Sequence, residues 1–215
     1  MTSPAPVQGP DDGRSVRKRR AIVAAATAAF LEHGYRGTSM DAIAAAAGVS
    51  KQTVYQHFGD KQRLFRELIA ATVQSASDPV HDEVRRLADS GHLEKDLRDL
   101  ARRLLILVLQ PEMMRLRRLV IAEARQFPDI GRFFYELGPG RTISALAETF
   151  AELTKQGRLT ATDAALAAGQ FNWLVMAAPL NEAMLLGQDD APTTREINRW
   201  ADSGVRTFLA AYADT

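Results

Sequence analysis

A cluster of hydrogen-bonding side chains lies in one short segment of the chain, residues 51–57. It reads Lys-Gln-Thr-Val-Tyr-Gln-His, and every residue except Val54 carries a side-chain donor or acceptor. Val54 and Phe58 are four residues apart, so on a helix they share a face that points into a core. Lysine suits the O6 and N7 atoms of guanine, glutamine suits adenine, and threonine offers its methyl group to thymine. The segment therefore has the chemistry of a helix that reads base edges in the major groove of DNA.

Two short helices joined by a tight turn are predicted to position this segment. Ser50 can cap the helix that follows it, and Thr38 or Ser39 can cap an earlier helix. Asp41 then lies near the positive end of that earlier helix's dipole. Gly48 ends the earlier helix, because glycine readily adopts the left-handed conformation of a tight turn. This pattern predicts a helix-turn-helix.

The residue types suggest two sets of DNA contacts. The base-facing candidates are Lys51, Gln52, Thr53 and Gln56. The phosphate candidates are Arg17, Lys18, Arg19 and Arg20, with Arg14 before them, and Tyr55, His57 and Lys61. Phosphate contacts give affinity and salt dependence without sequence information. Two alternatives stay open: Tyr55 as a core aromatic residue, and His57 as a capping residue at the helix end.

Charge is distributed unevenly along the chain. Residues 14–70 hold ten Lys and Arg against four Asp and Glu, whereas residues 71–215 hold seventeen against twenty. A basic head on a slightly acidic body indicates that the head is the part that meets a polyanion. A chance scatter of solvated charges is the alternative.

The composition narrows the class of protein. A hydrophobic content of 46% in 215 residues can bury one or two cores, and the absence of cysteine excludes disulfides and thiolate chemistry. The polar N-terminus lacks the apolar core of a signal peptide, and the apolar run at 104–110 is too short to span a membrane. We therefore expect a cytoplasmic protein without a membrane partner.

Helical periodicity runs through the whole chain, and no alternating strand pattern occurs, which predicts an all-α fold. Apolar stripes predict helices over 15–33, 61–77, 80–89, 93–109, 112–127, 141–156, 161–186 and 194–212, besides the two short ones. Ser77-Asp78-Pro79 is expected to end one helix, and Pro179 to kink or split another. Residues 1–13 are expected to form a disordered tail.

A set of spaced motifs runs from Arg19 to Ile69. It comprises Phe30-Leu31, Gly34-Tyr35, Thr38-Ser39, Ile43-Ala44, Ala47-Gly48-Val49-Ser50, Val54-Tyr55-Gln56-His57-Phe58 and Lys61. With these motifs the segment resembles the N-terminal domain of TetR-family transcriptional regulators, with Val54 where the family often has leucine. Residues 118–141 and the apolar helix after them resemble the AefR-like C-terminal domain of a subclass.

The resemblance implies a fold and a function. It implies a helix-turn-helix DNA-binding domain over 14–60, and a helical ligand-binding and dimerisation domain over 61–215 that begins with a linking helix, 61–77. It adds Tyr35 and Thr38 or Ser39 to the phosphate contacts. It also implies a homodimer that represses transcription from a double-stranded DNA operator until a small molecule releases it. An activator, or a DNA binder without a ligand, is the alternative.

The last two predicted helices carry small and apolar residues that suit a dimer face. The candidates are Ala165, Ala168, Gly169, Val205, Phe208, Leu209 and Tyr212. A second set suits a pocket for an apolar or amphipathic effector: Met113, Leu116, Val120, Phe127, Phe134, Trp173, Met176 and Asn172. Glu123, Arg125 and Asn181 are further polar candidates there. The alternative for both sets is the internal core of the body.

An enzyme is the rival from another class. The four histidines have no metal-ligand spacing, and the chain contains no phosphate-binding loop or nucleophile elbow. Glu94, Asp96 and Asp99 cluster on one predicted helix, which a solvated charged face explains better than a catalytic site. We expect no enzymatic activity, no metal and no cofactor.

Overall fold

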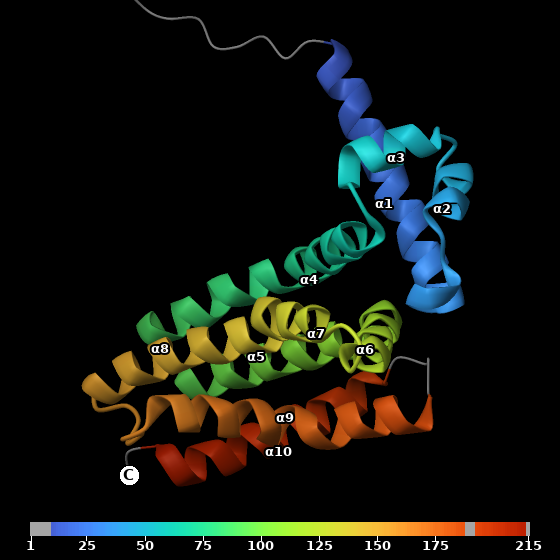
Figure 1. The fold of residues 1–215 in the computed structure, drawn as a ribbon. Coiled ribbons are helices and arrows are strands. Elements are labelled where there is room, and N and C mark those ends of the chain that lie inside the picture. The colour runs from blue at the N-terminus through green and yellow to red at the C-terminus, as the bar shows by residue number, and fades with distance from the viewer. Residues whose placement is uncertain (1–9, 188–191, 214–215) are drawn as a thin grey trace, which may run out of the picture. The chain divides into compact units, whose positions relative to one another are not determined.

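Helices form every regular element of the structure, which is a computed structural model describing residues 10–187 and 192–213 (Figure 1). This part of the chain contains no strand, and one isolated antiparallel bridge pairs Leu159 with Ala213. The all-α prediction is therefore confirmed. The chain divides into two compact units, Met1–Ile69 and Ala70–Thr215.

The first unit contains three helices and the beginning of a fourth. They are α1 (Pro10–Gly37), α2 (Met40–Ala46), α3 (Lys51–Phe58) and the first residues of α4 (Lys61–Arg86). Phe30 and Phe65 lie at the centre of its core, with ring centroids 5.0 Å apart. The unit extends to Ile69 because Phe65 packs on α1, whereas the sequence prediction placed the boundary at residue 60.

The start of α1 differs from the prediction. The helix begins at Pro10, so residues 10–13 are helical, whereas the sequence predicted a disordered tail through residue 13. Residues 1–9 of that predicted tail lie outside the described residues. Towards its other end α1 bends at Gly34, whose φ of 74° is outside the helical range.

The second unit contains the rest of α4 and the helical elements that follow. These are η1 (Leu87–Asp89), α5 (Leu93–Val108), α6 (Pro111–Ala124), α7 (Pro128–Tyr135), η2 (Glu136–Gly140), α8 (Arg141–Lys155), α9 (Ala164–Leu186) and α10 (Thr194–Tyr212). Phe150, Phe171 and Phe208 join α8, α9 and α10 through ring contacts of 4.9 to 5.7 Å. Gly204 lets α9 and α10 approach closely, because a Cβ there would lie 3.0 Å from the Leu174 carbonyl oxygen.

The two prolines inside α-helices, Pro79 and Pro179, do not interrupt them. The sequence predicted that α4 ends at Pro79, but the helix continues to Arg86. Val73, Val80, Val84 and Leu87 continue one buried apolar stripe past the proline, and their burial offsets a proline cost of about 3 kcal/mol. Pro179 likewise lies inside α9, which it does not split. Helix α7 and the wide turn η2 were not predicted as helical, because glycines and Pro139 dominate the sequence there.

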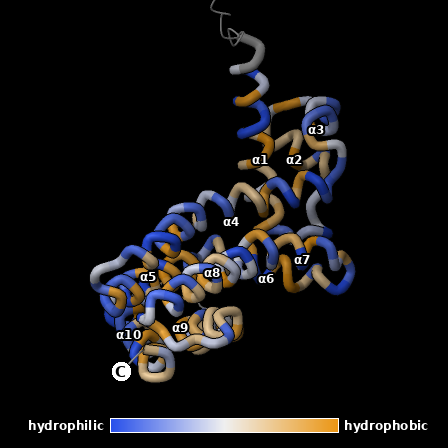
Figure 2. Tube along the Cα trace, turned by 90° about the vertical axis from the view of Figure 1, so that its left-hand side faces the viewer, coloured by the Kyte–Doolittle hydropathy of each residue, from blue (hydrophilic) through white to orange (hydrophobic). Residues whose placement is uncertain are grey.

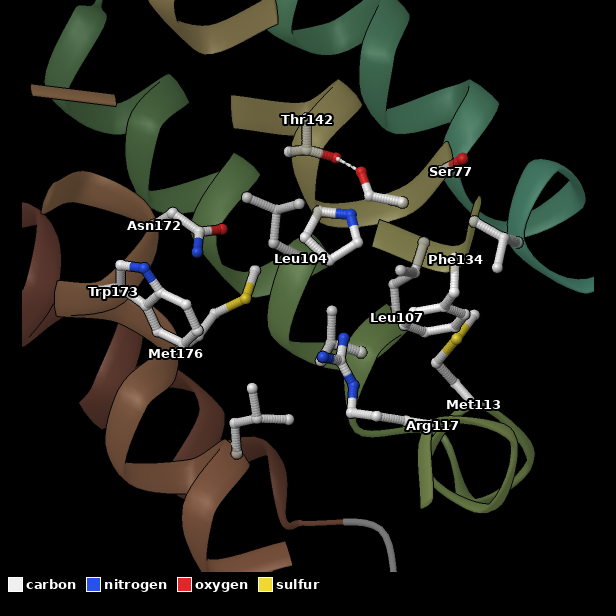
Figure 3. Close-up of a pocket in the computed structure, with 15 residues that line it drawn as sticks. Ser77, Leu104, Leu107, Met113, Arg117, Phe134, Thr142, Asn172, Trp173 and Met176 are labelled. Atoms are coloured by element: carbon white, nitrogen blue, oxygen red, sulfur yellow. Dashed lines mark hydrogen bonds between the residues drawn. The ribbon is translucent and has the colours of Figure 1, made fainter. Parts of the chain in front are cut away.

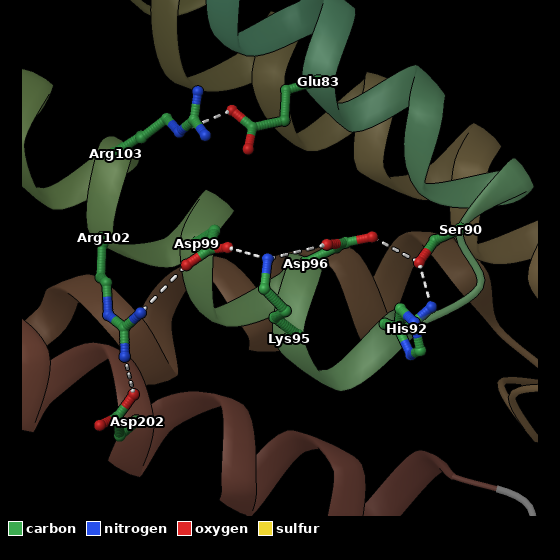
Figure 4. Close-up of polar contacts among 9 residues, drawn as sticks. All are labelled: Glu83, Ser90, His92, Lys95, Asp96, Asp99, Arg102, Arg103 and Asp202. Atoms are coloured by element: carbon green, nitrogen blue, oxygen red, sulfur yellow. Dashed lines mark hydrogen bonds and ion pairs between the residues drawn. The ribbon is translucent and has the colours of Figure 1, made fainter.

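The acidic residues of α5 are paired, as the charged-face interpretation requires (Figure 4). Asp99 accepts from Lys95 and Arg102 at 3.0 Å each, and Arg102 also donates to Asp202 of α10 at 2.9 Å. Glu94 pairs with Arg98. Across the described residues, no group of three or more His, Asp or Glu side chains is arranged to hold a metal. None of the described helices is both long and apolar enough to cross a membrane.

Candidate nucleic-acid interface and ligand pocket

Helix α3 separates its apolar from its polar side chains. The Ser50 hydroxyl caps the helix by accepting from the Thr53 amide at 3.1 Å. Val54 and Phe58 are buried, which anchors the helix to the first unit. The opposite side is exposed and carries Lys51, Gln52, Tyr55 and Gln56. The helix therefore presents a row of donors and acceptors on a fixed support.

The turn before α3 is built as predicted. Ser39 caps α2, since its hydroxyl accepts from the Ala42 amide at 3.1 Å. Gly48 has a φ of 64°, and a Cβ there would meet no atom within 4 Å. Its backbone conformation, and not a lack of space, is therefore the reason for glycine at this position.

Two base-facing candidates already have partners within the first unit. The Lys51 ammonium lies 2.8 Å from an Asp41 carboxylate oxygen of α2, and this hydrogen bond raises the pKa of Lys51. Its Nζ also lies 5.9 Å from the centre of the Tyr55 ring. The Thr53 hydroxyl lies 2.8 Å from that of Ser50. The other two candidates, Gln52 and Gln56, have exposed side chains. That Lys51, Gln52, Thr53 and Gln56 contact bases in DNA stays a prediction.

Three predicted phosphate contacts make interactions within the first unit, two of them from buried positions. Thr38 is buried, and its hydroxyl lies 2.9 Å from the Ala29 carbonyl and 2.8 Å from that of Gly34. Tyr35 is buried against Phe30. Lys61 donates to the Tyr35 and Thr38 carbonyls at 2.8 and 2.9 Å.

These contacts give the three side chains structural roles within the first unit, and their contacts with phosphates stay predictions. The last carbonyl groups of α1 have no N–H partner within the helix. The Lys61 ammonium and the Thr38 hydroxyl donate hydrogen bonds to them instead. The partners are up to 26 residues apart in sequence. Local patterns therefore could not distinguish this structural role from a phosphate contact.

The other phosphate candidates have accessible side chains. Arg17, Lys18 and Arg20 are exposed on α1, as is Ser39 at the start of α2, and His57 is partly buried. Arg19 is also exposed but pairs with Glu67 at 2.7 Å and lies over the Phe58 ring. An exposed pair of this kind contributes about 0.2–1 kcal/mol, so it leaves Arg19 able to exchange partners.

A pocket lies within the second unit (Figure 3). It contains about 600 Å³ of empty space, counting the part that opens to solvent. Most of its lining is apolar, from α4, α5, α6, α7 and α9. The predicted residues in the lining are Met113, Phe134, Asn172, Trp173 and Met176. Leu116, Val120 and Phe127 are not in the lining, nor are Glu123, Arg125 and Asn181.

The sequence prediction missed the most polar residue of the pocket. Arg117 lines it from α6, four residues after Met113. Residues four apart share one side of a helix, so Arg117 lies on the same apolar side of α6 as Met113. This spacing could have predicted from the sequence that its charge points inward. Ser77 and Thr142 were also missed, because α4 and α8 approach the pocket only through the tertiary fold.

The structure corrects part of the predicted dimer face. Ala168, Val205 and Phe208 have no exposed surface, because they pack between α8, α9 and α10. Gly169, Leu209 and Tyr212 are partly buried, and Ala165 is exposed. Helix α9 is mostly apolar along its length (Figure 2), with no single apolar side, so its inward side could not be chosen from sequence. Its exposed large apolar side chains include Leu166, Leu174 and Trp173, which are 43–55% exposed, and Trp173 also lines the pocket.

Comparison with known proteins assigns both units. The family model for bacterial regulatory proteins of the tetR family matches residues 22–68, and that for the AefR-like transcriptional repressor C-terminal domain matches residues 95–214. The chain belongs to the TetR family of transcriptional regulators. The TetR family consists of DNA-binding regulators and not enzymes, and its heads contain the helix-turn-helix seen in α2 and α3.

Individual relatives agree with this assignment. A candidate TetR-family regulator from Mesorhizobium loti is 41% identical, with a TM-score of 0.85 over 94% of this chain and 99% of that one. The flavonoid-responsive regulator FrrA is 36% identical, with a TM-score of 0.77 over 92% and 98%. The activator FasR of Mycolicibacterium smegmatis is 34% identical over 34% of this chain and 33% of its own. This chain thus matches only about a third of that curated relative.

Proposed function

We propose that this TetR-family protein is a repressor that binds a palindromic operator as a homodimer and is released by a small amphipathic molecule. The exposed row of Lys51, Gln52 and Gln56 on α3 carries the proposal, since these side chains match the base edges of the major groove. The exposed Arg17, Lys18 and Arg20 supply the phosphate contacts that give affinity. Its place of action is the cytoplasm, where the bacterial DNA lies.

A homodimer is supported by the outer side of α9. One such head reads only a few base pairs, and two heads related by a twofold axis read half-sites about one helical turn apart. Leu166 and Leu174 expose large apolar side chains that a second copy would cover, beside Trp173 at the pocket. The small exposed Ala165 lies next to Leu166 in the sequence. We therefore place the dimer face on the outer side of α9.

Release by a small molecule is supported by the pocket in the second unit. Its apolar lining with a few polar groups is typical of a site for an amphipathic ligand. FrrA, which is similar over nearly its whole length, is described as responsive to flavonoids. The AefR-like match of the body favours repression, whereas FasR is an activator, so an activator stays the second candidate.

Selection of bound sites from random double-stranded DNA tests the proposal. We expect an inverted repeat whose affinity falls steeply as the salt concentration rises. A reporter gene placed downstream of that site distinguishes repression from activation. Recovery of no enriched sequence would contradict operator binding, and a monomer in light scattering at micromolar concentration would contradict the dimer.

A further inference from the structure

An arginine in the ligand pocket has no anionic partner. Arg117 extends from α6 towards the middle of the pocket, with Trp173 and Met176 on one side and Phe134 on the other (Figure 3). Its Nε is buried and has no hydrogen-bond partner. Its one contact of note within the described residues is with the Phe134 ring, whose centre lies 5.3 Å from the guanidinium carbon.

The charge of Arg117 is therefore uncompensated in the described protein. Burial lowers the pKa of its guanidinium, and no carboxylate of the described residues counteracts that effect. An arginine nevertheless stays protonated in proteins, so the pocket holds a positive charge. A partly buried charge of this kind is costly unless a partner joins it. The neighbouring Arg118, in contrast, donates to the Ala183 carbonyl at 3.0 Å.

A second polar group of the pocket also lacks a partner. Ser77 lines the pocket from α4, is 5% exposed, and its hydroxyl makes no hydrogen bond within the described part of the chain. The residues around these two groups are apolar, and include Leu104, Leu107 and Met113. The pocket thus combines a cation and a hydroxyl with a wall that suits hydrocarbon or aromatic rings.

We propose that the effector is an amphipathic organic acid whose carboxylate pairs with Arg117 and whose apolar body lies against Phe134, Trp173 and Met176. The guanidinium presents a planar fork of donors that matches the two oxygens of a carboxylate. The aromatic and methionine side chains accommodate a flat or flexible body. This inference rests on the proposed ligand-binding function of the pocket, and adds the charge of the ligand to it.

Matched acids and amides test the charge directly. The probes are 3-phenylpropanoate, 2-naphthoate and biphenyl-4-carboxylate, each compared with its neutral carboxamide by the shift in Tm of the full-length protein. We expect at least one acid to raise Tm and to bind about tenfold or more tightly than its amide, since a hydrogen bond to a charged group is worth about 1.5–3 kcal/mol.

Two variants identify the residue responsible. Arg117→Met removes the charge but keeps an apolar chain, and Arg115→Met is its control at an exposed position of the same helix. We expect Arg117→Met to abolish the acid-specific shift without lowering the Tm of the free protein, and Arg115→Met to retain the shift. Equal shifts from acid and amide, equal shifts in both variants, no acid-specific shift with any probe, or a markedly lower Tm of free Arg117→Met would each overturn the proposal.

The Tm measurements need no DNA, and adding the same probes to the operator complex separates the acid-binding proposal from the proposal of ligand-controlled release. An acid that binds through Arg117 but leaves the operator complex intact would support the pocket chemistry and contradict ligand-controlled release. An operator complex that is released by a neutral molecule and not by any acid would contradict the pocket chemistry and leave ligand control standing.

Discussion

Replacing Lys61 by methionine should destabilise the first unit. The substitution keeps most of the apolar chain but removes the ammonium that bridges the Tyr35 and Thr38 carbonyls at 2.8 and 2.9 Å. It also removes the contact with the Tyr35 ring, 4.4 Å from Nζ. A hydrogen bond involving a charged group contributes about 1.5–3 kcal/mol, and the two bonds share one partly buried donor. We therefore expect a loss of about 2–4 kcal/mol in the free energy of unfolding of the first unit.

Native-state hydrogen exchange of amides in α1 to α3 measures this loss unit by unit. Arg63→Met, at an exposed position two residues further along α4, is the matched control and should change the free energy by less than about 0.5 kcal/mol. A structural role also leaves the slope of affinity against salt concentration unchanged. If amide hydrogen exchange is unchanged and the slope of affinity against salt concentration falls by about one ion, the structural role is refuted. Lys61 is then a phosphate contact.

Other substitutions test the remaining parts of the account. Asp41→Asn removes the carboxylate that holds Lys51 in place. With single-base variants of the operator, affinity should change at one base position in each half-site. An equal change at all positions would contradict the view that Asp41 orients Lys51 towards a base. Leu174→Glu should turn the dimer into monomers in light scattering, whereas Arg195→Glu, exposed at the start of α10, should leave it a dimer. Burial lowers the pKa of His81 in the folded state. As the pH falls below about 6.5, the His81 ring is therefore protonated in the unfolded state before it is protonated in the folded state. The free energy of unfolding should fall over this pH range until the folded state also binds the proton. His81→Asn should flatten this part of the stability profile in urea denaturation, and an unchanged profile would contradict it.

Local chemistry made the head predictable from sequence. The cap at Ser50, the positive φ at Gly48 and the buried pair Val54 and Phe58 depend on residues within one turn of each other. Lys61 shows the limit of such reasoning. Its type suits both a phosphate and a pair of carbonyls, and only the tertiary fold brings the carbonyls within reach.

The body was less predictable because its helices are apolar on more than one side. The sequence identified α9 and α10 as closing helices, but it placed Val205 and Phe208 on the outside, and the structure packs them inside. Pro79 predicts a helix end by its residue type, but a buried stripe runs past it. Arg117 shows that a single charge among the apolar residues of α6 is the informative feature of that helix.

Binding of the selected operator by Gln52→Ala and Lys18→Ala, over a panel of single-base variants, tests the central claim most directly. Both side chains are exposed, one on α3 and the other in the basic cluster of α1. We predict that Gln52→Ala loses discrimination of about 1–3 kcal/mol at one base pair in each half-site, and that Lys18→Ala weakens every sequence alike and lowers the salt slope. Uniform weakening by Gln52→Ala would contradict the claim that α3 reads the operator.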